Sequence, residues 1–461
     1  MLEAQEQRAN LVPTGNTVIP SVPGHWEIRT MRSLITARSE RDRTDLPLLS
    51  VARERGVFVR SPEDNNHNVI PTDLSNYKAA RKGDLIINKM KAWQGSLGLA
   101  PEEGIVSPAY YVYDFEIENR YFGQALLRSK PYVALLGAAS DGVRIGQWDL
   151  SVTRFRELPV LVPPPEEQAA IVKYLGHAHA RIDRAIAAKR KLIALLEEQK
   201  QAVIHQAVIH GLDPSVPLMD TSIPWLGRVP AHWTVERAKY VFREVDERST
   251  TGAEEQLSVS HLTGVSPRKS TVTMFRAESY VGHKVCRPDE LIVNTMWAWM
   301  GALGVARDAG IVSPSYGVYR LQGTTKMQPA YLDLLLRTPR YVSYFKSEST
   351  GIRSSRLRLY PDQLGTTPLP IPPMSEQRDI VGHLEALSNE YGAVRAKAMS
   401  EIELLREFRT RLTSDVVTGQ IDVREIAATL PELTDDALDA GDEPFDDDDD
   451  ISGLEVDGAD G

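Results

Sequence analysis

The sequence is an internal duplication, and this feature constrains the fold more than any other. Six blocks recur in the same order at a separation of 206–209 residues. The longest match pairs residues 83–113 with residues 289–319, and both segments contain GIVSP followed by a tyrosine two residues on. Self-similarity at a fixed separation indicates a repeated structural unit. We therefore expect the chain to fold as two copies of one unit.

The other five blocks lie on both sides of this match. They are VPGHWEI and VPAHWTV (22–28 and 229–235), LSVARERGVFVR and LSVSHLTGVSPR (49–60 and 257–268), LLRSKPYV and LLRTPRYV (126–133 and 335–342), GVR and GIR (142–144 and 351–353), and VPPPEEQAAIVKYL and IPPMSEQRDIVGHL (162–175 and 371–384).

The character of the sequence changes once within each copy. The first part contains short β-rich runs, such as residues 84–88 and 110–115, separated by glycine and proline, which is typical of a mixed α/β domain. After the prolines, apolar residues recur at alternating steps of four and three, the heptad spacing of a coiled-coil helix. The predicted seam positions are Ile171, Leu175, Ala178, Ile182, Ala185, Lys189, Leu192, Leu196, Gln199 and Val203, and Ile380, Leu384, Leu387, Tyr391, Val394, Ala398, Glu401, Leu405, Phe408 and Leu412.

Both seams keep the same phase, so the two helices are expected to cover each other as an antiparallel pair. The predicted fold class is α+β: two homologous mixed α/β domains joined by two long antiparallel coiled-coil helices, in a pseudo-twofold dumbbell. The predicted boundaries are 1–163 for the first domain, 164–211 for the first spacer helix, 212–371 for the second domain, 372–420 for the second spacer helix and 421–461 for an acidic disordered tail.

The net charge of −10 is concentrated at one end of the chain. Residues 431–461 contain 14 of the 63 acidic residues and no lysine or arginine, so the rest of the chain has 53 basic and 49 acidic residues. This weakly basic body neither requires nor excludes a nucleic-acid partner. The single cysteine, Cys286, fits a reducing compartment, and no apolar run suggests a membrane span or a secretory signal. We expect a cytoplasmic protein.

Motifs for catalysis are absent from the sequence. It contains no GxxxxGK[ST] phosphate loop, no GxGxxG dinucleotide turn and no HExxH metal motif. His177 and His179 are two residues apart on a predicted helix and so face different sides of it. We predict no catalytic residue and no metal site in this chain.

The chain resembles the specificity subunits of type I restriction–modification systems. The resemblance rests on the duplicated GIVSP-x-Y segment, the A-W-x-G-x-L-G block before it, the G-[VI]-R element and the double PP-x-x-EQ-x-x-I-V-x-x-L helix start. It implies two target-recognition domains and a non-catalytic, prokaryotic subunit that binds double-stranded DNA. It also implies two methyltransferase subunits and restriction/translocase subunits as partners. S-adenosylmethionine, ATP and magnesium would then be cofactors of those partners, and this chain would hold none.

Two similar but non-identical domains on a rigid spacer suit a bipartite, asymmetric DNA target with an unread middle. Side chains that differ between the copies are candidates for base contacts, and those that match, such as Arg144 and Arg353, are candidates for phosphate contacts. Each is weighed against the alternative of a solvated surface charge or a structural ion pair. The candidate DNA-binding residues are Arg38, Arg41, Arg43, Arg53, Arg55, Arg60, Lys89, Lys91, Arg144, Arg248, His261, Arg268, Lys269, Lys284, Arg353 and Arg356. The candidate coiled-coil and partner contacts are Ile171, Leu175, Ile182, Leu192, Leu196, Ile380, Leu384, Leu387, Leu405 and Phe408.

Two other interpretations remain open at this stage. One is the specificity subunit of a related system that cuts on both sides of its site, which would share this architecture and differ in its partners. The other is a coiled-coil adaptor without DNA contact, which predicts no salt-dependent binding of a duplex.

Overall fold

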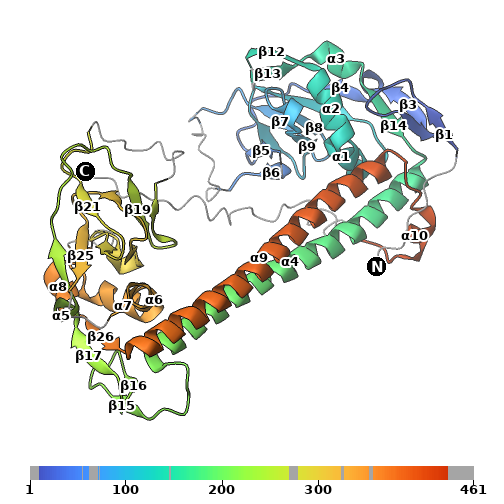
Figure 1. The fold of residues 1–461 in the computed structure, drawn as a ribbon. Helices are drawn as coiled ribbons and strands as arrows, with labels where there is room; N and C mark the ends of the chain where they lie inside the picture. Colours follow the sequence, from blue (N-terminus) through green and yellow to red (C-terminus); the bar gives the residue numbers. More distant parts are fainter. Residues whose placement is uncertain are drawn as a thin grey trace. The chain divides into compact units, whose positions relative to one another are not determined.

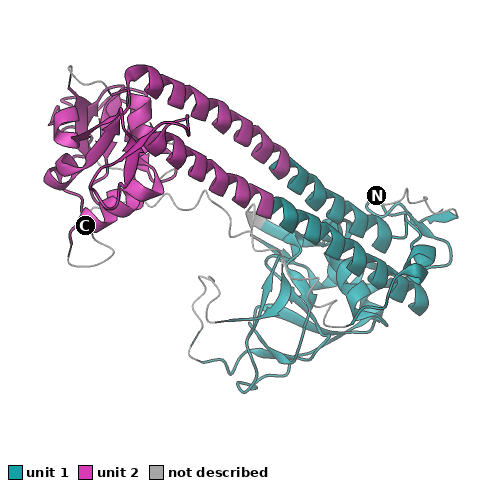
Figure 2. Cartoon of the chain, turned by 90° about the horizontal axis from the view of Figure 1, so that it is seen from below, with its two compact units in different colours: residues 1–190, 399–449 teal, residues 191–398, 450–461 magenta. Residues whose placement is uncertain are grey.

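The computed structural model describes residues 10–434 except 54, 62–70, 72, 145–146, 269–278, 323–326 and 352–356. The chain divides into two compact units. Unit 1 comprises Met1–Arg190 and Met399–Asp449, and unit 2 comprises Lys191–Ala398 and Asp450–Gly461 (Figure 2). Each unit contains one of the two sequence copies together with parts of both long helices, and each is described by itself.

A four-stranded antiparallel sheet with the order β4-β11-β8-β9 forms the centre of unit 1 (Figure 1). Its strands are β4 (Ile35–Ala37), β8 (Leu85–Asn88), β9 (Leu97–Leu99) and β11 (Tyr110–Phe115). Successive side chains of a strand point to opposite faces of the sheet. Leu85 and Ile87 accordingly lie in one hydrophobic core and Ile86 in another, and all three are fully buried. This explains why the first three residues of β8 are all apolar, rather than alternate ones.

Two-stranded pairs complete the β structure of unit 1. They are β1 (Leu11–Pro13) with β2 (Ser21–Pro23), β3 (Glu27–Thr30) with β14 (Pro159–Val162), β5 (Leu49–Ala52) with β6 (Gly56–Val59), β7 (Lys78–Ala80) with β10 (Gly104–Val106), and β12 (Ser140–Arg144) with β13 (Gln147–Leu150). The pairing of β3 with β14 joins the beginning of the unit to the segment that leads into the first long helix.

Unit 2 repeats this topology, as the duplication predicts. Its sheet has the order β18-β25-β22-β23. The strands are β18 (Phe242–Val245), β22 (Leu291–Val293), β23 (Leu303–Val305) and β25 (Gly317–Leu321). The flanking pairs are β15 (Leu218–Asp220) with β16 (Arg228–Pro230), β17 (Thr234–Arg237) with β26 (Pro368–Ile371), β19 (Leu257–Ser260) with β20 (Gly264–Pro267), and β21 (Lys284–Cys286) with β24 (Gly310–Val312). Leu291 and Val293 again lie in one core and Ile292 in another.

Short helices cover one face of each sheet and supply the largest buried side chains. They are α1 (Arg120–Arg128), α2 (Lys130–Ala138) and α3 (Val152–Arg156) in unit 1, and α5 (Ala238–Val241), α6 (Pro329–Leu336), α7 (Pro339–Glu348) and α8 (Pro361–Thr366) in unit 2. Tyr132 of α2 and Tyr341 of α7 occupy matching positions. Both are fully buried, and each hydroxyl donates to a carbonyl of the strand before a long helix, that of Pro159 at 3.0 Å or of Pro368 at 2.7 Å.

Two long helices, α4 (Pro165–His210) and α9 (Met374–Val417), lie within the ranges predicted for the spacer helices. In unit 1 their contacts run in opposite directions along the two sequences, so the helices are antiparallel there. The contacts are His179 with Thr413 at 2.9 Å, Asp183 with Arg409 at 3.0 Å, and Lys189 with Glu401.

Most positions of the predicted seam are buried or partly buried, and four are exposed. Ile171, Leu175, Ile182, Ile380 and Leu384 are buried, and Leu196, Leu387 and Leu405 are partly buried. Leu192 is 44%, Val394 is 39% and Phe408 is 37% exposed, and Gln199 is exposed as well. An α-helix has 3.6 residues per turn, whereas a strict heptad spacing corresponds to 3.5, so a straight helix drifts away from the heptad positions. The interface near Phe408 is instead occupied by Ile402 and Arg409.

The repeated PP-x-x-EQ motif at each long helix has a structural role. Gln168 and Gln377 are fully buried. The Gln168 side chain accepts a hydrogen bond from the Asn119 backbone N–H at 3.0 Å and donates to the carbonyl of Pro163 at 2.9 Å. Gln377 makes the equivalent bonds, accepting from the N–H of Gln328 at 2.7 Å and donating to Pro372 at 2.8 Å. Each glutamine therefore fixes the start of a long helix against the start of α1 or α6.

The glutamate of the same motif contacts the repeated His-Trp segment. His25 lies 2.8 Å from Glu167 in unit 1, and His232 lies 2.8 Å from Glu376 in unit 2. Gly419, with φ of +75°, leaves so little room beside Trp26 that an added Cβ would lie 3.0 Å from its ring. The His-Trp segment thus holds the beginning of one long helix beside the end of the other within each unit.

The predicted disordered tail begins too early. Helix α10 (Arg424–Thr429) follows α9, and Val423 and Ala427 are each 2% exposed in the core of unit 1. Lys173 of α4 also forms an ion pair with Glu432 at 2.6 Å. Residues 421–434 are ordered because their apolar side chains are spaced to pack on the long helices, which acidic composition alone does not reveal. The predicted tail from residue 435 onward lies outside the described residues. Within the described part of the chain, no helix is both long and apolar enough to cross a membrane.

Candidate nucleic-acid interface

The turn between β8 and β9 is exposed at its tip and is held by side-chain hydrogen bonds to its own backbone. Its N-x-M-x-A-W-x-G sequence, residues 88–95, recurs at residues 294–301, and we call both the Asn-Met-Trp turn. The side chain of Asn88 accepts from the N–H of Met90 at 3.2 Å, and the Trp93 indole donates to the carbonyl of Met90 at 3.2 Å. The Met90 side chain itself is 51% exposed.

The same bonds form the turn of unit 2. The Asn294 side chain accepts from the N–H of Met296 at 3.3 Å, and the Trp299 indole donates to the carbonyl of Met296 at 2.8 Å. The ring of Trp299 stacks on that of Trp297, with centroids 5.9 Å apart. The repeated residues of the turn therefore determine its shape, and the residues between them determine what it presents.

The structure brings this turn together with the element that carries Arg144. The N–H of Leu150 in β13 donates to the carbonyl of Lys89 at 2.9 Å, and Lys89 forms an ion pair with Asp149 at 3.3 Å. The rings of Trp93 and Trp148 also lie 5.0 Å apart. In unit 2 the N–H of Leu359 donates to the carbonyl of Thr295 at the same distance of 2.9 Å. In unit 1 the Asn-Met-Trp turn therefore adjoins the β12–β13 pair, which includes the G-V-R element.

The predicted residues of the β5–β6 hairpin lie at or next to its turn. The Arg55 guanidinium lies 4.0 Å from the centroid of the Phe58 ring, and Arg53 is exposed. In unit 2 the equivalent hairpin, β19–β20, places His261 in its turn. A Cβ built on Gly301 would lie 4.0 Å from the Cβ of His261, so this hairpin adjoins the Asn-Met-Trp turn.

Several other candidate residues have different surroundings. Arg60 directly follows β6, Arg41 and Lys91 are exposed, and Arg268 donates to the side chain of Gln256 at 3.4 Å. Lys269, Arg353 and Arg356 lie outside the described residues, as does the side chain of Arg144.

Arg38 and Arg43, two of the candidate DNA-binding residues, form ion pairs with acidic groups of unit 1. Arg38 donates to Asp84 at 3.0 Å and also pairs with Asp114. The Asp84 carboxyl is nearly fully buried, and burial raises its pKa although Arg38 partly offsets this effect. Arg43 pairs with Asp45 at 3.0 Å, and this hydrogen bond raises the pKa of Arg43 and lowers that of Asp45.

In unit 2 the equivalent buried acidic residue pairs with an arginine that lies on a different strand. Glu290, which matches Asp84, pairs with Arg320 of β25, and Arg320 also donates to Glu247 at 3.0 Å. The hydrogen bond from Arg320 lowers the pKa of Glu247. Because Arg320 replaces Asp114, the cation and the acid have exchanged strands between the units. In both units an arginine of this network neutralises a buried acidic side chain, and Arg38 has this structural role in unit 1.

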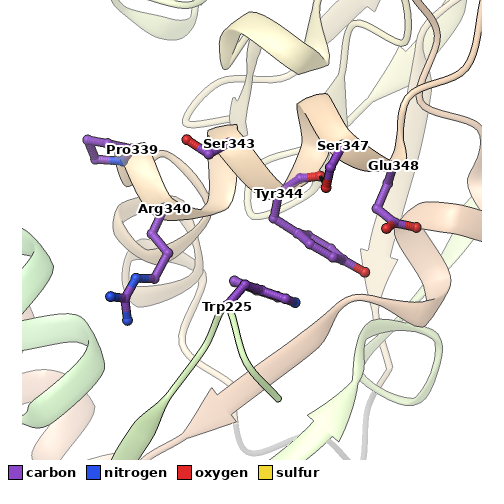
Figure 3. A pocket seen from close by; sticks show the side chains of 7 residues that line it. All are labelled: Trp225, Pro339, Arg340, Ser343, Tyr344, Ser347 and Glu348. Carbon is purple, nitrogen blue, oxygen red and sulfur yellow. Dashed lines mark hydrogen bonds between the residues drawn. The ribbon is translucent and has the colours of Figure 1, made fainter.

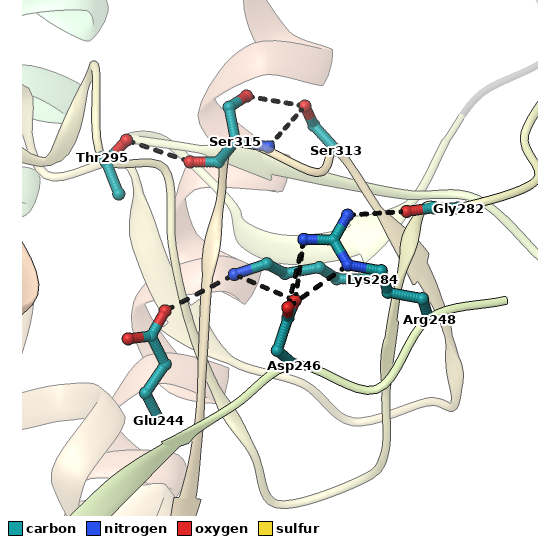
Figure 4. Close-up of polar contacts among 8 residues, drawn as sticks. All are labelled: Glu244, Asp246, Arg248, Gly282, Lys284, Thr295, Ser313 and Ser315. Atoms are coloured by element: carbon teal, nitrogen blue, oxygen red, sulfur yellow. Dashed lines mark hydrogen bonds and ion pairs between the residues drawn. The ribbon is translucent and has the colours of Figure 1, made fainter.

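Lys284 and Arg248 are likewise engaged within unit 2 (Figure 4). Lys284 is only 7% exposed and pairs with Glu244 at 3.4 Å and Asp246 at 3.7 Å. Arg248 pairs with Asp246 at 3.0 Å and donates to the carbonyl of Gly282 at 3.2 Å. The ammonium group of Lys284 points into this acidic cluster, an arrangement that favours a structural ion pair over the predicted contact with DNA.

Substitutions of Lys284 and Lys91 are therefore expected to have opposite effects on stability and on the salt dependence of DNA binding. Lys284→Ala removes two ion-pair contacts and is expected to lower the free energy of unfolding by about 1–3 kcal/mol, without changing how salt weakens duplex binding. Lys91→Ala should leave stability unchanged and reduce the magnitude of the salt slope of binding by about one. Denaturant unfolding and duplex titrations at several salt concentrations measure both effects. A Lys284→Ala protein of normal stability with a smaller salt slope would contradict this assignment.

A cavity of about 530 Å³ lies at α7 of unit 2 (Figure 3). It is lined by Trp225, Pro339, Arg340, Ser343, Tyr344, Ser347 and Glu348. The rings of Trp225 and Tyr344 stack with centroids 4.1 Å apart. Unit 1 has Leu135 and Ala139 where unit 2 has Tyr344 and Glu348. The polar lining of the cavity is therefore specific to unit 2.

Among the residues that sequence reasoning did not propose for DNA contact, Met90 and Trp148 stand out in unit 1. Met90 is exposed at the tip of the braced turn, and Trp148 contacts Trp93. The repetition of Asn, Met and Trp at the same spacing in both copies is the sequence pattern that could have indicated this turn. Within the described residues, no group of three or more His, Cys, Asp or Glu side chains is arranged to hold a metal ion.

No family model matches the sequence, and no curated protein matches it. Solved structures do. A chain from a structure describing the complex assembly and conformational transition of the type I R-M system is 16% identical, with a TM-score of 0.60, and the match covers 87% of this chain and 99% of that chain. The HsdS subunit from Thermoanaerobacter tengcongensis is 17% identical, with a TM-score of 0.47 and coverage of 87% and 98%. The type I restriction–modification S subunit from M. genitalium is 14% identical, with a TM-score of 0.31 and coverage of 89% and 97%.

The first of these matches spans nearly the whole of its chain and shows the fold. This chain, with its duplicated α/β unit and two long helices, thus shares its fold with that chain of the type I R-M structure. The predicted fold of two homologous mixed α/β domains with two long helices is confirmed.

Proposed function

We propose that this chain is the sequence-specific DNA-binding subunit of a type I restriction–modification complex and that its two units recognise the two halves of an asymmetric target. One observation carries the proposal: the units share one framework but present different side chains from equivalent turns. Lys89 and Lys91 in unit 1 correspond to Thr295 and Trp297 in unit 2. Arg53 corresponds to His261. Residues that read different bases must differ in this way.

The shared framework extends to charged residues next to these turns. Arg128 lies over Gly56, which has a φ of +66°, and donates to the carbonyl of Arg53 at 3.3 Å. Arg337 lies over Gly264 in the same manner and donates to the carbonyl of Leu262 at 2.7 Å. These matched arginines stabilise the hairpin turns, so that the variable side chains are presented from a constant position.

We infer that the catalytic steps belong to partner subunits. The sequence carries no motif for methyl transfer, ATP hydrolysis or phosphodiester cleavage. Two similar units offer two similar surfaces, which suits two copies of one methyltransferase subunit, joined by restriction/translocase subunits. S-adenosylmethionine, ATP and magnesium would act in those partners.

Methylation mapping tests this function. We expect a host that carries this chain with its methyltransferase partner to methylate a motif of two different half-sites separated by unread bases. The motif should disappear from the genome when this chain alone is deleted. Continued methylation of the same motif after the deletion would assign the recognition to another subunit. Absence of any methylation and of salt-dependent duplex binding by the complex would favour the adaptor interpretation.

A further inference from the structure

The Asn-Met-Trp turn of unit 1 carries an exposed methionine between two lysines. Exposure of one apolar side chain is common on protein surfaces. What distinguishes Met90 is the way the chain holds it. Its N–H and its carbonyl are both bonded, to the side chains of Asn88 and Trp93, and the flanking Lys89 carbonyl accepts from Leu150. The backbone of this tip is therefore fixed, and its 51% exposed apolar side chain points away from the unit's core.

The charges around Met90 favour a polyanionic partner over an apolar protein surface. Lys91 is exposed on the same turn, and Lys89 is partly exposed, with its ammonium group 3.3 Å from the exposed carboxylate of Asp149. Arg144 ends the adjoining strand β12. A rigid tip with an apolar end and cationic flanks matches the arrangement by which proteins place a side chain between base pairs while lysines contact the phosphates.

Methionine suits insertion between bases because it is unbranched and polarisable, and it is among the side chains that unstack base steps. The aromatic pair beneath it, Trp93 and Trp148, with ring centroids 5.0 Å apart, gives the tip a stiff support. In unit 2 the corresponding Met296 is less exposed and lies between Thr295 and Trp297, without the flanking lysines. The two turns therefore share a backbone and differ in the features that favour insertion.

We propose that Met90 is a DNA-inserting side chain that unstacks one base step of the half-site recognised by unit 1. This inference rests on the proposed function, because it requires the complex to bind duplex DNA. It assigns to unit 1 a deformation of the duplex that does not depend on hydrogen bonds to base edges, and it makes the deformation asymmetric between the two half-sites.

The test uses the complex of this chain with its methyltransferase subunits and duplexes of the mapped target. 2-Aminopurine replaces, one at a time, each purine of the half-site other than the methylated base, and its fluorescence rises where stacking is lost. We expect a rise at one position with the unaltered complex, loss of most of that rise with Met90→Ala, and retention with Met90→Leu. Met296→Ala is the matched control and should leave this signal unchanged. The salt slope of binding should be the same for all variants, because no phosphate contact is removed.

Three results would overturn the proposal in distinguishable ways. A full fluorescence rise with Met90→Ala would show that another group unstacks the bases. Loss of methyltransferase subunits from a Met90→Ala chain of normal circular dichroism would identify the turn as a protein-docking site. Failure of the unaltered complex to bind any duplex would reject the proposed function itself.

Discussion

Replacing residues 10–163 with the corresponding segment of a relative of different specificity is expected to change one half-site of the methylated motif and leave the other intact. The physical reason is that unit 1 and unit 2 each contain a complete sheet and separate hydrophobic cores. The exchange must run from β1 to the end of β14, because β14 pairs with β3 along its whole length. Methylated-motif sequencing of a host carrying the chimaera measures the result.

The contacts at the first long helix set a condition for this exchange. Glu167 and Gln168 remain in the recipient and bond to His25 and Asn119 of the exchanged segment. The donor must supply residues that can make both bonds. Exchange of residues 212–371 is the matched control, since it should alter the other half-site alone. A chimaera in which both half-sites change, or neither, would refute the assignment of one reader to each unit.

Gly310→Ala is expected to destabilise unit 2 and abolish recognition of its half-site. Gly310 begins the second GIVSP segment, and a Cβ there would lie 2.5 Å from the carbonyl oxygen of Glu255 and 2.8 Å from Cγ of Leu257. That carbonyl cannot move freely, because it accepts from the N–H of Ile311 at 2.8 Å. Overpacking of this kind typically costs about 1–3 kcal/mol. Thermal unfolding followed by circular dichroism measures the loss.

The same chain supplies the comparison for Gly310. Gly392 lies in α9, and nothing stands within 4 Å of a Cβ built on it. Gly392→Ala should therefore raise helix stability by up to about 1 kcal/mol and leave the methylated motif unaltered. Gly104→Ala is the counterpart in unit 1, where the Cβ would meet the carbonyl of Pro47 at 2.8 Å, and it should affect the other half-site. Equal stability of Gly310→Ala and the unaltered chain would mean that the strand can shift to accommodate a methyl group.

Local patterns were sufficient to predict the large features of this protein. The matched blocks predicted two units of one topology, and the sheet orders β4-β11-β8-β9 and β18-β25-β22-β23 agree with that prediction. The heptad spacing predicted both long helices, and Gly211, with φ of +81°, directly follows α4 at the predicted helix end. Such features depend on residues close together in sequence, or on the comparison of one copy with the other, and both are visible without coordinates.

The environment of individual cations was not predictable in this way. Arg38 meets Asp84 and Asp114 only because β4, β8 and β11 are adjacent strands. Lys284 meets Glu244, 40 residues earlier in the chain, in the same manner. In the sequence, an arginine or lysine that pairs with an acidic residue of a neighbouring strand cannot be distinguished from one whose charge faces solvent. Phe408 also fits the heptad spacing and yet is 37% exposed, because an α-helix drifts from a strict heptad repeat.

The amino-acid sequence by itself determined the duplication, the two long helices and the segments that correspond between the units, because repetition and periodicity are properties of the chain alone. Only the tertiary structure decided which of the candidate cations are held in ion pairs, that residues 421–434 pack on unit 1, and that the Asn-Met-Trp turn and the strand ending in Arg144 form one surface. Most of these outcomes depend on contacts between residues far apart in the sequence, such as that of Leu150 with Lys89, and the energies of such contacts depend on burial and geometry that no local pattern contains.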